Sequence, residues 1–134
     1  MTKKKGDKPS ELDLRDERIL AEIIAWAEGH PNTVRPRTGQ WLQLRDGQVD
    51  PDGPCCAVGA GLLYRGIDAR EYLASSSGTE IFARKYGVSE AFAQGVDNGF
   101  EDRTLFGSNR TDDYARGLSV GIAAREWAES MGRR

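Results

Sequence analysis

The feature that most constrains the fold of this chain is a run of small residues, Ala57-Val58-Gly59-Ala60-Gly61, that follows the turn-forming Pro54. Proline is favoured in the first turn of a helix, so we expect a helix from Cys55 to about Arg65. Gly59 and Gly61 leave this helix nearly bare, although glycine inside a helix costs about 1 kcal/mol relative to alanine. We therefore expect another stretch of backbone to pack very close to this helix.

The only two cysteines of the chain, Cys55 and Cys56, lie side by side at the expected start of this helix. A thiol in that position is either a small core residue or a reactive group whose pKa is lowered by the helix dipole. We expect one or both thiols to pack in the core, and a reactive thiol remains the alternative. A nucleophilic cysteine usually needs a base, and the single histidine, His30, lies between Gly29 and Pro31 in an expected loop. The sequence therefore predicts no catalytic residues.

The length of the chain, 134 residues, fits one domain that can bury a core. No apolar stretch follows the basic N-terminus as in a signal peptide, and no apolar run approaches the length of a membrane span. Two adjacent cysteines do not make a disulfide framework. We therefore expect a cytoplasmic protein with free thiols and no membrane partner, either a monomer or a homodimer.

Charge divides the chain into a basic tail and an acidic body. The whole chain has a net charge of −2 and its first eight residues carry +3, so the remainder carries −5. We expect residues 1–9 to form a disordered tail and residues 10–134 to form the single domain. Because phosphate contacts need a basic surface, we expect no nucleic-acid partner apart from contacts made by the tail.

Helical periodicity and capping residues predict a mainly α fold of about five helices with one small antiparallel β-hairpin. Apolar residues recur on one face over 11–28, where Asp16 is an exception on the apolar side. Ser77, three residues before Glu80, predicts a helix over 78–86. Further signals predict a short helical turn over 68–74, a helix from 90 to about 97 that ends at Asn98-Gly99, a loop over 100–110 with Phe100, Leu105 and Phe106 tucked in, and a last helix from Thr111 to about Met131.

Two local features predict how these elements pack. Asp46-Gly47, between short apolar-rich runs, predicts the hairpin at about 39–50, with Trp41 as its large apolar anchor against the helices. Gly117 and Gly121, four residues apart in the last helix, predict a shallow groove. We expect this groove to receive the bare helix at 57–61.

Several motifs resemble catalytic or metal sites only in part. Gly117-Leu118-Ser119-Val120-Gly121 matches the nucleophile elbow by letter, but no apolar strand precedes it. Two acidic clusters could bind a hard cation weakly, yet turn formation explains both; they are Asp46, Asp50 and Asp52, and Asp97, Glu101 and Asp102. Two thiols and one histidine fall short of a four-ligand zinc site. We therefore expect no metal and no cofactor.

The order of the motifs resembles that of a group of small uncharacterised proteins of bacteriophages and actinobacteria. The resemblance rests on the hairpin at Gly39–Gly47, the Cys55-Cys56-Ala57-Val58-Gly59-Ala60 helix start, Tyr86-Gly87-Val88-Ser89 and Asp97-Asn98, and covers roughly residues 39–125. It implies a compact helical fold with a small hairpin, and a phage-borne protein that works in the host cytoplasm. No activity is implied by it.

Three functions follow as expectations. The first is a non-enzymatic accessory protein, plausibly phage-encoded, that binds a macromolecular partner, most simply a protein of host machinery or host defence. The second is a small-ligand or nucleotide-binding protein, with a pocket between the hairpin and the Cys55 helix lined by Arg35, Arg37 and Trp41. A cysteine-dependent enzyme or redox protein is the third expectation.

Overall fold

The computed structural model describes residues 13–36, 41–75, 77–102 and 111–133, and these form six helices and one antiparallel hairpin. The elements in chain order are α1 (Leu14–Gly29), β2 (Gln43–Arg45), β3 (Gln48–Asp50), α2 (Ala57–Tyr64), α3 (Ala69–Leu73), α4 (Gly78–Tyr86), α5 (Glu90–Glu101) and α6 (Asp112–Ser130). The prediction of a mainly α fold with one hairpin is confirmed. Leu105, Phe106 and the basic tail lie outside the described residues.

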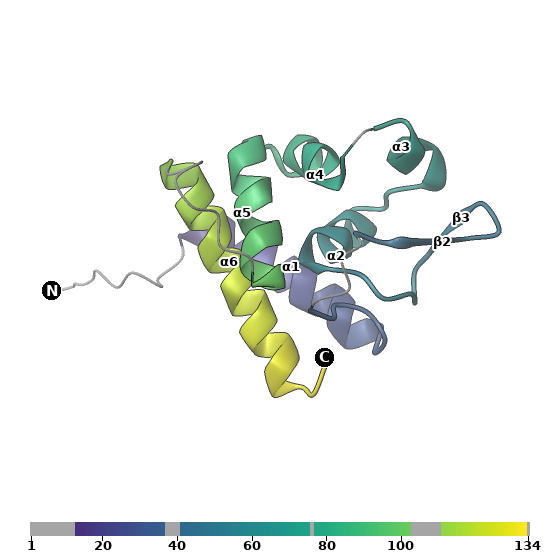
Figure 1. Ribbon diagram of the computed structural model, residues 1–134, viewed down its shortest axis with the longest axis horizontal. Helices are drawn as coiled ribbons and strands as arrows, with labels where there is room; N and C mark the ends of the chain where they lie inside the picture. The colour runs from purple at the N-terminus through teal and green to yellow at the C-terminus, as the bar shows by residue number, and fades with distance from the viewer. Residues whose placement is uncertain (1–12, 37–40, 76, 103–110, 134) are drawn as a thin grey trace, which may run out of the picture.

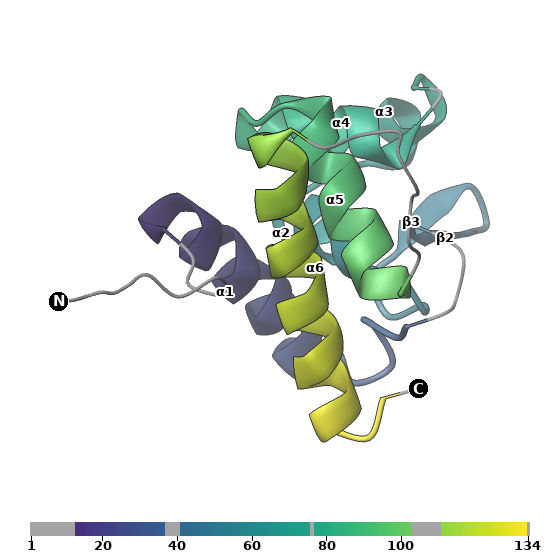
Figure 2. The same cartoon turned by 60° about the vertical axis from the view of Figure 1, so that its left-hand side comes forward.

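The helices pack around α2, which lies in the middle of the molecule (Figure 1). Every residue of α2 from Ala57 to Leu63 is buried. Helices α5 and α6 lie side by side on one side of the molecule, and the hairpin projects from the other side near α3 (Figures 1 and 2). None of the described helices is both long enough and apolar enough to span a membrane.

The two glycines of α2 admit neighbours where a side chain would not fit. A Cβ atom on Gly59 would overlap the carbonyl oxygen of Trp41, at 1.4 Å, so the chain entering the hairpin crosses α2 in direct backbone contact. The predicted close backbone approach is confirmed at this position. At Gly61 the neighbours are side chains instead, because a Cβ there would lie 2.8 Å from the Phe82 ring and 3.1 Å from the Tyr86 hydroxyl.

The groove at Gly117 and Gly121 receives α5, and the expectation that it receives α2 is wrong. A Cβ on Gly117 would lie 2.0 Å from the carbonyl oxygen of Phe92, and one on Gly121 would lie 2.2 Å from that of Val96. On α5, Gly95 and Gly99 are equally close to the backbone of α6. Four glycines, two on each helix, therefore let the two backbones touch.

Helix α5 continues to Glu101, so the predicted break at Asn98-Gly99 is wrong. Gly99 faces Leu118 of α6, where its missing side chain allows close packing. Asn98 is buried and donates its side-chain amide to the hydroxyl of Tyr114 at 3.2 Å. Tertiary contacts with α6 thus offset the weak helix propensity of this pair, and Phe100 is buried as part of the helix rather than in a loop.

Predicted turn and cap positions are confirmed. Asp46 and Gly47 have φ angles of 54° and 77°, as a tight two-residue hairpin turn requires, and Leu44 pairs with Val49 across the ribbon. The hydroxyls of Ser77, Ser89 and Thr111 each accept a hydrogen bond from the backbone N–H three residues later. These local signals fix where α4, α5 and α6 begin.

The first and last helices are joined by charged side chains. Asp16 of α1 is 1% exposed, and its carboxylate accepts hydrogen bonds from Arg116 Nε and Arg15 Nε, each at 3.0 Å. Arg116 also pairs with Asp13, the residue that caps α1. The acidic residue that interrupts the apolar face of α1 is therefore the attachment point of α6.

Candidate functional site

The predicted pocket residue Trp41 lines a surface pocket of about 200 Å³. Its indole packs on the start of α4, where a Cβ on Gly78 would lie 2.5 Å from Trp41 Cδ2. The other described lining residues include four from α3 and the connection that follows it, and these are Tyr72, Leu73, Ser75 and Ser77. Leu73 is 67% exposed, so it forms an apolar rim beside the opening.

The hydroxyls of both serines that line this pocket are hydrogen-bonded within its wall. Ser77 Oγ caps α4 and lies 2.6 Å from Thr79 Oγ1. Ser75 Oγ donates to Glu80 Oε1 at 2.6 Å. The rings of Trp41 and Tyr72 and the side chain of Leu73 supply the apolar part of the lining, which makes up the larger share of the pocket surface.

The other two residues predicted for the pocket are not brought to it by the described structure. Arg35 belongs to the loop after α1, where its backbone N–H donates to Cys55 O at 2.9 Å and its Nε donates to Asn32 O at 3.1 Å. It is not among the described residues that line the Trp41 pocket, and this pocket lies beside α3 and the start of α4, whereas the expected pocket lay between the hairpin and the Cys55 helix. Arg37 lies outside the described residues. The proposed binding roles of both arginines stay predictions.

Both cysteines are free thiols in the core, which confirms the expected burial. Burial raises the pKa of the Cys55 thiol to about 12, although the Val34 N–H and the Arg133 charge act to lower it. Burial also raises the pKa of Cys56 well above its usual value, and the nearby charges of Asp97 and Cys55 add to this effect. A nucleophilic cysteine needs a lowered pKa, so these surroundings disfavour a reactive thiolate.

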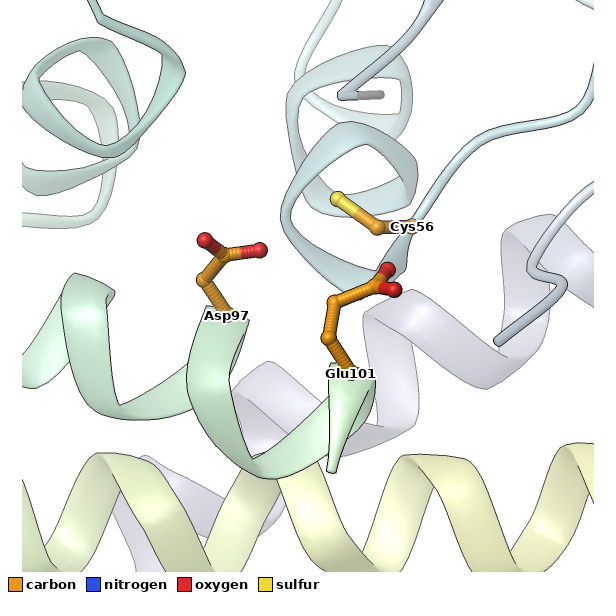
Figure 3. Close-up of side chains that lie close together, drawn as sticks. All are labelled: Cys56, Asp97 and Glu101. Carbon is orange, nitrogen blue, oxygen red and sulfur yellow. The ribbon is translucent and has the colours of Figure 1, made fainter. Parts of the chain in front are cut away.

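The structure brings Cys56 to two members of an acidic cluster on α5. Cys56 immediately precedes α2, while Asp97 and Glu101 lie one turn apart on α5, and their donor atoms are all within 4.8 Å of one another. Figure 3 shows the two carboxyl groups rising from the same side of α5 toward the thiol. Cys56 and Glu101 are buried and Asp97 is partly exposed. Sequence spacing gave no sign of this cluster, because Cys56 and Asp97 lie 41 positions apart in the chain.

Three other acidic residues of the two expected acidic clusters take part in different contacts. Asp102 ends α5 and pairs with Arg125 of α6 at 3.0 Å. Asp50 accepts a hydrogen bond from the Asp52 N–H at 3.0 Å and lies 3.8 Å from Arg45. These contacts are those of a capped helix end and a turn.

The two weaker catalytic motifs are built into helix and loop packing. Ser119 lies in the interior of α6 and donates to the carbonyl oxygen of Ala115 at 3.2 Å, so it is not on a strand-to-helix elbow. His30 stacks on the Trp26 ring with 3.7 Å between centroids, and its Nδ1 lies 2.9 Å from Trp26 O. These contacts give both residues structural roles.

The chain matches no protein-family model, and neither a curated protein nor a solved structure matches it. The resemblance to phage and actinobacterial proteins stays a prediction.

Proposed function

We propose that this protein is a non-enzymatic accessory protein that binds a protein partner by receiving one apolar side chain in the Trp41 pocket. The observation that carries the proposal is the pocket of about 200 Å³ with the exposed Leu73 beside it. Large apolar side chains that fill a partner's pocket contribute most of the energy of many protein interfaces. The resemblance to phage proteins makes a host protein the natural partner.

The volume of the pocket favours a side chain over a whole small molecule. Pockets for drug-sized ligands usually enclose about 300–1,000 Å³, whereas a cavity of about 150 Å³ holds benzene. A pocket of about 200 Å³ therefore suits a phenyl or isobutyl group, as in phenylalanine or leucine. A nucleotide would also need a cationic group for its phosphate, and Arg35 is not among the described residues lining this pocket.

The test is a peptide selection followed by affinity measurement on matched variants. A random peptide library is selected on the immobilised protein, and the enriched peptides are measured by calorimetry against wild type, Leu73→Asp and Leu14→Asp. Leu73 and Leu14 are 67% and 81% exposed, so a new carboxylate at either position should leave the fold intact. We expect the peptides to share a leucine or an aromatic residue.

The two variants should differ clearly. Leu73→Asp places a charge at the pocket rim, so its affinity for the selected peptides should fall at least about tenfold, or about 1.4 kcal/mol. Leu14→Asp on α1 should bind the peptides like wild type. Equal binding by Leu73→Asp and wild type would place the partner surface elsewhere. Failure to enrich any peptide, together with tight binding of a free aromatic fragment, would favour the small-ligand alternative.

A further inference from the structure

We propose that Cys56, Asp97 and Glu101 form a binding site for one divalent transition-metal ion of the zinc class. This inference is independent of the partner-binding proposal, because the cluster lies between α2 and α5 and includes none of the described residues that line the Trp41 pocket. The donor atoms are one sulfur and two carboxylate oxygens, all within 4.8 Å of one another.

The spacing of the donors suits a single ion. Zinc binds sulfur at about 2.3 Å and carboxylate oxygen at about 2.0–2.2 Å, so two ligands of a tetrahedral ion lie about 3.5 Å apart. The three donor atoms, all within 4.8 Å of one another, would have to draw together by up to about 1.3 Å, which rotation of the side chains allows. Asp97 and Glu101 are four residues apart on α5, which places both carboxyl groups on one face of that helix.

The type of donor selects the class of metal. Thiolate ligands favour zinc and similar soft or borderline ions, whereas calcium and magnesium prefer sites made of oxygen alone. Three protein ligands leave a fourth position for water on a tetrahedral ion. On binding, the Cys56 thiol would release its proton to solvent and become the thiolate ligand.

The burial and charge of these side chains also favour a bound cation. Cys56 is 1% and Glu101 is 7% exposed, and one thiol and two carboxyl groups converge in this space. A divalent cation bound between them would attract both carboxylates and favour the thiolate form of Cys56. The partly exposed Asp97 provides a route by which an ion could enter from solvent.

The neighbouring thiol provides a control within the same chain. Cys55 is as deeply buried as Cys56, but the charged group that acts on it most is the guanidinium of Arg133, and it is not part of the cluster. Replacing either cysteine by serine removes one buried thiol. Only the Cys56 replacement removes a proposed ligand.

The experiment titrates cobalt(II) into the reduced, tag-free full chain after treatment with a chelator. Cobalt bound to thiolate gives a sulfur-to-metal charge-transfer absorption, and zinc should displace it. We expect this absorption at one cobalt per chain in wild type and in Cys55→Ser. Cys56→Ser should lose the absorption, and its affinity for the ion should fall by more than the ~10–100-fold that loss of an outer-shell partner costs.

Asp97→Asn tests the site by a replacement at a partly exposed position that the fold should tolerate. It should keep the helical circular dichroism of wild type and bind cobalt more weakly. A wild-type protein that shows no thiolate absorption would overturn the proposal. An absorption that survives in Cys56→Ser, or that is lost equally in Cys55→Ser, would do the same.

Discussion

Asp16 is an acidic side chain on the apolar face of α1, and its environment explains why it is tolerated there. Its carboxylate is 1% exposed and receives Arg116 from α6 and Arg15 from its own helix. A buried charge is costly unless it is paired and hydrogen-bonded. The two arginines meet that requirement, so the residue that breaks the sequence pattern is the one that joins α1 to α6.

Asp16→Ala should therefore destabilise the protein more than a change at a neighbouring acid. Removing one partner of a fully buried ion pair costs about 3–5 kcal/mol. The Arg116 side chain is 38% exposed and can regain water, so we expect a loss of about 2–3 kcal/mol in urea denaturation. Glu17→Ala, in the same turn but exposed, should change stability by about 0.5 kcal/mol or less. Equal stability of the two variants would contradict the role given to Asp16.

Ionisation of the Tyr86 phenol makes the stability of the protein depend on pH in alkaline solution. Its hydroxyl lies 2.9 Å from Glu22 Oε1 and 3.1 Å from Gly61 O, and burial, followed by the bond to Glu22, raises its pKa well above the ordinary value of 10.0. In the unfolded chain this phenol ionises near its ordinary pKa. The stability that it contributes is therefore fully present below about pH 10 and is lost as pH rises above that value.

Tyr86→Phe should make the free energy of unfolding fall less steeply with rising pH than it does in wild type. The slope due to one such group is at most about 1.4 kcal/mol per pH unit, and urea denaturation at neutral pH and above about pH 10 measures it. At neutral pH the free energy of unfolding of the variant should be about 1 kcal/mol lower than that of wild type, because the hydrogen bonds of the hydroxyl are missing. This difference should become smaller as pH rises, because wild type loses stability and the variant does not lose this part of it. Tyr64→Phe, at a 46% exposed position, is the matched control, and its free energy of unfolding at neutral pH should lie within about 0.5 kcal/mol of wild type. A gap that stays constant with pH would count against this assignment.

At the scale of the elements, the pairing of α5 with α6 depends on glycine. Gly117→Ala would place a methyl group 2.0 Å from the carbonyl oxygen of Phe92, and backbone cannot move aside as a flexible side chain can. The gain in helix propensity is about 1 kcal/mol, while overpacking costs about 1–3 kcal/mol or more. We expect a net loss of stability in chemical denaturation.

Gly29→Ala is the matched control for this change. Gly29 is the last residue of α1, and no atom lies within 4 Å of a Cβ placed on it. This variant should therefore be as stable as wild type or slightly more stable. If Gly117→Ala were also neutral, the close contact of the two helices would not be needed for stability.

The sequence predicted the ends of elements better than their partners. Ser77 and Gly87 at the ends of α4, and the Asp46-Gly47 turn, act within three or four residues, so their effect can be read locally. The partner of the Gly117 groove depends on contacts across the fold. The signal that could have identified it is the matching four-residue spacing of Gly95 and Gly99, which was obscured because Asn98-Gly99 is typical of a helix end.

At the scale of the whole molecule, the candidate sites are products of long-range packing. Trp41 was predicted as a large apolar anchor, and its place beside α3 and α4 follows from a backbone crossing at Gly59 that only the folded chain reveals. Cys56 and the acidic pair on α5 have no sequence pattern in common, because no spacing rule relates residues in different elements. The sequence showed which residue types could form both sites, but it could not show that these residues lie close together in the fold.

The ion pair between Asp16 and Arg116 also has a consequence for chain entropy. It joins residues 100 positions apart, so it closes most of the described chain into one loop. The entropic cost of closing a loop rises only with the logarithm of its length. A disulfide at the same place would restrict the unfolded ensemble as well, whereas this pair leaves the unfolded chain free. The first and last helices therefore hold each other only while the core between them is formed.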